Sequence, residues 1–172
     1  MMELITQGSL DGFCGLYATA HLIAVLSATD YEASTNKAFF QLLRSLERRR
    51  RLTAKRIAST NPNELGFTAR FIADAVNETP TRSRQGIAAV SFKDATFKRS
   101  AYFKNAPLAF ENGCGFVIQV DQGNHWVATS EKGSAGRYIC FDPSAEREHA
   151  EFGKIFWDEG LMVGPTRVIE AL

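Results

Sequence analysis

Cys14 joins a polar, glycine-containing segment that begins at Gln7 to an apolar run that has the composition of a helix. A cysteine in the first turn of a helix faces the partial positive charge of the exposed backbone N–H groups, which favours the thiolate form. The thiolate is the nucleophilic form of cysteine, so Cys14 is the candidate nucleophile of an acyl-transfer reaction. The alternative is a small buried residue without chemistry, as many cysteines are.

The chain has three histidines that could serve as the base for this thiol. A general base must come within about 3 Å of the proton that it takes. His21 follows Cys14 by seven residues on the expected helix, a rise of about 10 Å, so it is out of reach. His149 stands in a charged segment that we expect to face solvent. By elimination His125 is the base, the alternative being a half-exposed strand histidine with no role.

Asp142 ends an expected strand and stands directly before Pro143. If this strand pairs with the strand that begins at His125, the two side chains meet at one end of the sheet. The carboxylate would then orient the imidazole and stabilise its charged form. An aspartate before proline is also a common turn residue, and Asp121 is a second candidate for the same role.

Two further residues have candidate roles beside this series. The side-chain amide of Gln7 and the backbone N–H of Cys14 are candidate donors to the oxyanion that forms during acyl transfer. Trp126 follows the candidate base directly. It either covers the hydrogen bond between His125 and Asp142 or fills the core.

Together these residues resemble the papain-like cysteine peptidase superfamily. The resemblance is carried by Gln7, by the segment Asp11-Gly12-Phe13-Cys14-Gly15-Leu16-Tyr17-Ala18, by Asn124-His125-Trp126-Val127 and by Phe141-Asp142-Pro143-Ser144. It implies an α+β fold in which a helical half with the nucleophile helix precedes an antiparallel sheet. It also implies Gln7 in the oxyanion hole, Cys14 as nucleophile, His125 as base and Asp142 as the orienting residue.

The resemblance covers these motifs rather than the whole chain. Phe13-Cys14-Gly15 stands where papain has Ser-Cys-Trp, and the third residue of the series is Asp rather than Asn. The chain is also short, as in the compact bacterial or effector-type branches of the superfamily. Those branches include peptidases, glutamine deamidases, acyltransferases and inactive relatives, so the substrate class stays open at this point.

The hydrophobic pattern predicts one α+β domain over residues 1–172, with a helical part over about 1–80 and a sheet part over about 86–172. The expected helices cover 14–27, 37–51 and a segment that follows a loop at 61–64 and ends at about 76. The expected strands cover 87–92, 115–120, 125–129 and 137–141, with a last strand near Thr166 to Ile169.

The bulk composition is that of an ordinary globular protein, with 45% hydrophobic and 23% charged residues in a chain of 172. A net charge of +1 gives no global reason to expect nucleic acid or a membrane as partner. We expect a protein or peptide substrate and no cofactor. We find neither a signal peptide nor a membrane span, so we expect a cytoplasmic protein, with delivery by a dedicated secretion system as the alternative.

The three cysteines are widely spaced, which favours a reducing compartment over a disulfide framework. No short metal-ligand spacing occurs, and a metal site would need Cys14, Cys114, Cys140 and His125 to converge. Two further functions remain open. One is hydrolysis of murein peptides. The other is a binding module that uses basic residues, which are Arg48 to Arg51, Lys55, Arg56, Arg82 and Arg84.

Overall fold

The computed structural model describes residues 13–27, 31–50, 52, 69–78, 86–91, 108–120, 125–132, 138–143, 150–152 and 160–169. Several residues singled out in the sequence lie outside these ranges, namely Gln7, Asp121, His149, Arg51, Lys55, Arg56, Arg82 and Arg84.

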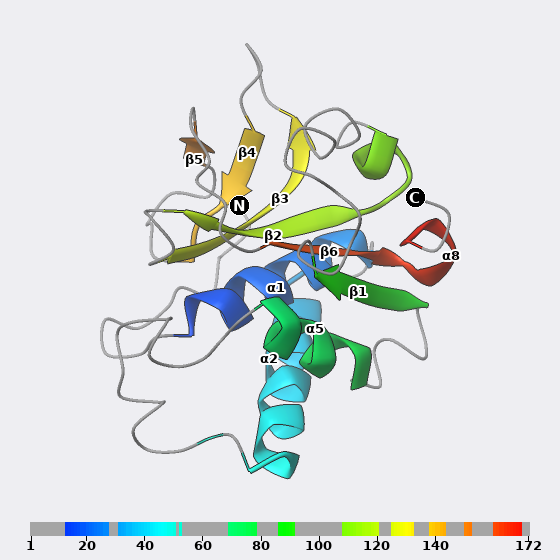
Figure 1. The fold of residues 1–172 in the computed structure, drawn as a ribbon. Coiled ribbons are helices and arrows are strands. Elements are labelled where there is room, and N and C mark those ends of the chain that lie inside the picture. Colours follow the sequence, from blue (N-terminus) through cyan, green and yellow to red (C-terminus); the bar gives the residue numbers. More distant parts are fainter. Residues whose placement is uncertain are drawn as a thin grey trace.

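The described residues form a six-stranded antiparallel sheet in the order β1-β6-β2-β3-β4-β5 (Figure 1). The strands are β1 (Ile87–Ser91), β2 (Gly115–Val120), β3 (His125–Lys132), β4 (Tyr138–Phe141), β5 (Ala150–Phe152) and β6 (Gly160–Pro165). Strands β2, β3 and β4 follow one another in the chain and pair with their neighbours. Strand β6 is inserted between β1 and β2, so the last strand in the chain lies inside the sheet.

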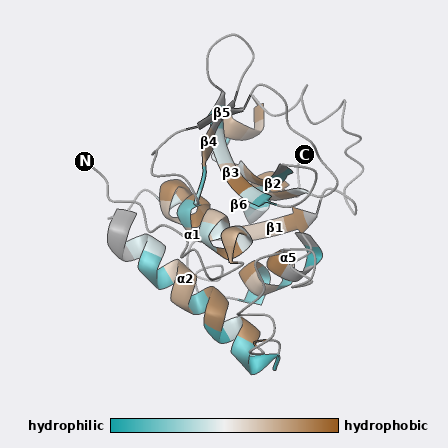
Figure 2. Ribbon diagram, turned by 90° about the vertical axis from the view of Figure 1, so that its left-hand side faces the viewer, coloured by the Kyte–Doolittle hydropathy of each residue, from teal (hydrophilic) through white to brown (hydrophobic). Residues whose placement is uncertain are grey.

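Helices α1 (Cys14–Leu26), α2 (Tyr31–Arg48) and α5 (Ala69–Glu78) lie on one side of this sheet, and the short helix α8 (Thr166–Ile169) follows β6 (Figure 1). Residues 108–111 are also helical. Helix α1 lies directly on the sheet, and α2 and α5 pack beside it (Figures 1 and 2). Ten of the 13 residues of α1 are buried, as expected for a helix that is apolar on nearly every side.

Alternation along the strands builds two separate apolar layers. Val117 faces the helices together with Trp126 and Leu161. Its neighbours Phe116 and Ile118 point to the opposite face, where a second cluster contains Cys114 and Cys140 and is bordered by Phe110, Val168 and Ile169. The sheet therefore has a covered apolar surface on both sides.

The predicted α+β class and the antiparallel sheet are confirmed. The strand predicted near Thr166 to Ile169 is wrong, because the last strand is Gly160–Pro165 and the residues after it form α8. The buried run Leu161-Met162-Val163 fits a central strand, which is apolar on both faces. Helix α2 begins at Tyr31 rather than at 37, since its polar first turns carry no apolar periodicity. Strand β5 was not expected.

A side chain of α5 forms hydrogen bonds with the backbone of the edge strand β1. Nδ2 of Asn77 donates to the carbonyl oxygen of Ala89 at 3.0 Å, and its Oδ1 accepts from the Ala89 N–H at 3.1 Å. The side-chain amide thus satisfies the donor and the acceptor that Ala89 turns away from β6.

Within the part of the chain that the structure describes, no helix combines the length and the apolar character needed to cross a bilayer.

Helix α1 approaches the sheet closely where β2 begins, at Gly115. A methyl group on Gly115 would lie against the Leu22 side chain and 2.9 Å from the carbonyl oxygen of Thr129 on β3. We therefore expect Gly115→Ala to lower the free energy of unfolding by about 2 to 3 kcal/mol through overpacking, measured by urea denaturation.

Gly86→Ala is the matched control for this substitution. A methyl group there meets nothing within 4 Å, and the backbone φ of +64° is the only source of strain, with a cost of about 1 kcal/mol. A loss at Gly115 no larger than the loss at Gly86 would contradict the close packing of α1 on β2.

Candidate active site

Cys14 is the first residue of α1, and the helix begins without a side-chain cap. The carbonyl oxygen of Phe13 accepts hydrogen bonds from the N–H groups of Leu16 and Tyr17, at 2.8 and 2.9 Å. Leu16 is the first residue whose N–H donates a hydrogen bond within the helix. The N–H groups of Cys14 and Gly15, at the very start, have no intrahelical acceptor. The Cys14 side chain is therefore held at the positive end of a helix whose body is buried.

Strands β3 and β4 bring His125 and Asp142 together. His125 begins β3, and Asp142 directly follows the last residue of β4. The two strands are antiparallel neighbours, so the start of one and the end of the other lie at the same end of the sheet. Nε2 of His125 lies 2.7 Å from Oδ1 of Asp142, a short hydrogen bond in which about 15% of each side chain is exposed.

The Cys14 side chain also acts on the His125 imidazole and raises its pKa. Burial is the largest single influence on the pKa of His125 and lowers it. The hydrogen bonds and charges of Asp142 and Cys14 act in the opposite direction and raise the pKa of His125 to about 9. The imidazole is therefore protonated at neutral pH, and the three residues form a continuous series.

Trp126 follows His125 directly in the chain and holds the start of β3 in the core. Its side chain is fully buried, and its ring packs against Gly15, where an added Cβ would lie 3.4 Å from Cδ1 and Cγ of the indole and 2.9 Å from Cδ1 of Ile72. The close neighbours of Gly15 are thus side chains and not backbone. Of the two roles considered for Trp126, core packing is the one that these contacts show.

The role of Ile72 beside Gly15 was not predicted. Ile72 lies on α5, and only the packing of α5 against α1 brings it next to Gly15, the residue that follows the candidate nucleophile. A glycine directly after a candidate nucleophile was the available signal, since it indicates a close approach.

The other two cysteines lie away from Cys14, in the apolar cluster on the opposite face of the sheet. Burial raises the pKa of the Cys114 thiol to about 11 and that of Cys140 to about 12. The four ligands that a metal site would need thus do not converge. Among the described residues, no group of three His, Cys, Asp or Glu side chains is arranged to hold a metal ion.

The remaining candidates are placed as follows. His21 is buried and stacks on Phe141, with ring centroids 6.5 Å apart, so it belongs to the core. Gln7, Asp121 and His149 lie outside the described residues, and their roles stay predictions.

Comparison of the chain with protein-family models, with curated proteins and with solved structures finds no match. Cys14, His125 and Asp142 are therefore the features of the chain that indicate a function.

The hydrogen bond to Asp142 predicts an unusual titration of His125. Below pH 9 the imidazole should stay charged, whereas an unperturbed histidine loses its proton near pH 6.5. We expect the ¹³Cε1 resonance of His125 to shift near pH 9 in NMR spectra of histidine-labelled protein. Asp142→Asn removes the negative partner and should move the midpoint to lower pH.

The spectrum of His125→Gln identifies the resonance among the three histidines. A His125 midpoint near 6.5 in the wild-type protein, unchanged by Asp142→Asn, would show that the two side chains are not coupled.

Proposed function

We propose that the chain is a thiol-dependent hydrolase of papain-like architecture that cleaves a peptide or amide bond through an acyl-enzyme on Cys14. The observation that carries this proposal is the 2.7 Å hydrogen bond between His125 and Asp142, on an imidazole whose pKa the Cys14 side chain also raises. A core cysteine or a structural histidine alone would not need this arrangement.

In the acylation step, the Cys14 sulfur attacks the carbonyl carbon of the substrate. The negative charge that develops on the carbonyl oxygen is stabilised by the backbone N–H of Cys14, and Gln7 is the predicted second donor. Protonated His125 then gives its proton to the leaving nitrogen, the C–N bond breaks and an amine departs. The products are a thioester on Cys14 and a neutral imidazole.

In the deacylation step, neutral His125 takes a proton from water while the water oxygen attacks the thioester carbon. The C–S bond breaks, and the carboxylic acid product leaves. The proton on His125 and the negative charge on the sulfur restore the starting pair.

Asp142 keeps the base in one orientation throughout this cycle. Its bond to Nε2 fixes the orientation of the ring, and its negative charge compensates for the burial of the imidazolium. The same series serves glutamine deamidation or acyl transfer to an amine, because these reactions differ only in the leaving group or in the acceptor.

Selective alkylation tests the candidate nucleophile without a known substrate. Cys14 is only 2% exposed, so the reagent must be small, and iodoacetamide is suitable. We expect one carboxamidomethyl group per chain at pH 6 to 7, located on Cys14 by peptide mapping. His125→Ala should slow the reaction, because the thiol loses the base that takes its proton.

Cys114 and Cys140 provide the internal control for this experiment, because both are fully buried with raised pKa values of about 11 and 12. Equal alkylation of all three cysteines, or a Cys14 profile unaffected by His125→Ala, would exclude an activated nucleophile.

Turnover should depend on the sulfur itself. We expect Cys14→Ala to abolish product formation while the circular dichroism spectrum stays unchanged. Asp142→Asn should retain a residual rate, roughly 10²- to 10⁴-fold lower, because it weakens the orientation and charge of the base. The measurement is mass spectrometry of a peptide library and of intact proteins after incubation with the enzyme.

The products identify the reaction. New peptide termini indicate a peptidase, release of ammonia with an intact chain indicates a deamidase, and a covalent amine adduct indicates an acyltransferase. Product formation that persists in Cys14→Ala would rule out the proposed nucleophile.

A further inference from the structure

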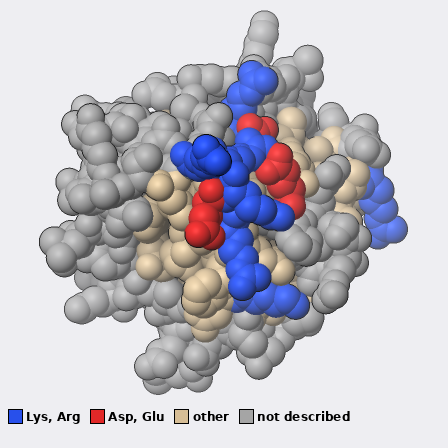
Figure 3. Space-filling model, turned by 90° about the horizontal axis from the view of Figure 1, so that it is seen from below, with Lys and Arg blue, Asp and Glu red and all other residues tan. Residues whose placement is uncertain are grey.

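Helix α2 presents a basic stripe to solvent on the side that faces away from the core. Its buried side chains include Ala38, Leu42 and Leu46, which pack under α1. The opposite side carries Lys37, Phe40, Arg44 and Arg48, which we call the basic seam. All four residues are exposed, and Phe40 is 62% exposed although it is aromatic. Figure 3 shows Lys and Arg gathered in a band on this side of the molecule, with Asp and Glu flanking it.

The charges of the basic seam are not balanced along the helix. A surface helix is stabilised when an acid stands four residues from a base, but Arg44 and Arg48 are two like charges at this spacing. None of the three cations lies within ion-pair distance of a described carboxylate, although the charge of Arg48 contributes to the lowered pKa of Glu78. The seam is therefore a local excess of positive charge on a chain whose net charge is only +1.

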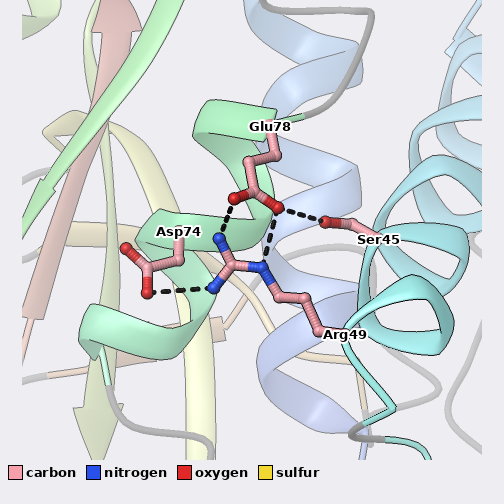
Figure 4. A network of polar contacts seen from close by, with 4 residues as sticks. All are labelled: Ser45, Arg49, Asp74 and Glu78. Atoms are coloured by element: carbon pink, nitrogen blue, oxygen red, sulfur yellow. Dashed lines mark hydrogen bonds and ion pairs between the residues drawn. The ribbon is translucent and has the colours of Figure 1, made fainter.

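The neighbouring Arg49, in contrast to the seam residues, forms ion pairs with another helix (Figure 4). It turns toward α5, where it donates to both carboxylate oxygens of Glu78 and, at 3.2 Å, to Oδ2 of Asp74. The hydrogen bond with Glu78 raises the pKa of Arg49, and the bond with Arg49 lowers the pKa of Glu78. The run of arginines is thus divided. Arg49 fixes α2 against α5, and this leaves Arg48 on the outer side.

The spacing of the basic seam is that of a helix-packing surface. Its residues follow one another at intervals of three, four and four, which places them along one side of α2 over about 16 Å. We propose that the basic seam is a docking surface for an acidic amphipathic helix of a partner protein. Carboxylates of that helix pair with Lys37, Arg44 and Arg48, and an apolar side chain packs on Phe40. This inference concerns a partner and is independent of the proposed hydrolase activity.

Local charge favours a protein helix over nucleic acid as the occupant. Glu47 precedes Arg48 directly and is exposed, and Asp74 and Glu78 pair with the adjoining Arg49. These carboxylates would repel the continuous negative charge of a phosphate backbone. A helix with a few separated carboxylates can place its charges on the seam and its neutral residues beside these acids. An exposed aromatic ring in the middle of the stripe also matches the usual anchor of a protein interface.

The test uses the full chain with Cys14→Ala, so that the probe cannot be cleaved. The probe is a fluorescein-labelled helical peptide with glutamates at heptad spacing and one leucine between them, and its twin carries lysines instead. Binding is followed by fluorescence anisotropy at low and high salt. We expect the glutamate peptide to bind at low salt, and Arg44→Glu to weaken it roughly tenfold.

Charge exchange makes the test specific. The double variant Arg44→Glu/Arg48→Glu should prefer the lysine peptide. Phe40→Ala should weaken binding of the glutamate peptide, and it should not affect a glutamate peptide from which the leucine has been removed. Arg70→Glu, an exposed arginine of α5 outside the seam, is the control and should leave binding unchanged.

Three outcomes would overturn the proposal. They are absence of binding at low salt, equal effects of Arg44→Glu and Arg70→Glu, and tighter binding of single-stranded DNA of the same charge than of the peptide. The last outcome would identify a nucleic-acid surface. None of the three depends on the reactivity of Cys14, so failure here would leave the hydrolase proposal unchanged.

Discussion

Burial of α1 between the sheet and the other helices is the constraint on which the site depends. Only Tyr17, Val25 and Leu26 of this helix escape full burial, so its position is fixed by packing along almost its whole length. Gly15 and Gly115 are the points where side chains and backbone approach it most closely. Cys14 therefore occupies a defined position relative to β3, because the core rather than a surface loop places it.

In the site itself, the burial of His125 is balanced by the polar groups of its two neighbours. A charged imidazole is unfavourable where His125 lies, yet the negative carboxylate on one side and the sulfur on the other reverse this preference. The three groups consequently depend on one another. Removing Asp142 leaves a buried cation with one partner fewer, and removing His125 leaves the sulfur without its polar neighbour. Such mutual dependence makes single substitutions in this series strongly non-additive.

Sequence patterns predicted this arrangement to different degrees. The buried helix after Cys14 and the strands around Val117 and Val127 were predictable, because long apolar runs and turn residues mark them. The sequence predicted that His125 and Asp142 meet if β3 pairs with β4, and the two strands do pair. The position of β6 between β1 and β2 was not predictable, since nothing local to Leu161 specifies which strands flank it. The same holds for Ile72, whose place beside Gly15 results from helix packing. Gln7 remains a prediction from the motif.

The contact between Asn77 and Ala89 affects how this protein behaves at high concentration. An open sheet edge is a template on which a second chain can add a strand, and this is a common route to aggregation. The amide of Asn77 occupies the hydrogen-bonding groups of Ala89, in the middle of β1, as a neighbouring strand would. An incoming strand would have to displace a side chain held by α5 before it could pair there. One asparagine thereby makes this edge of the sheet a poor site for self-association.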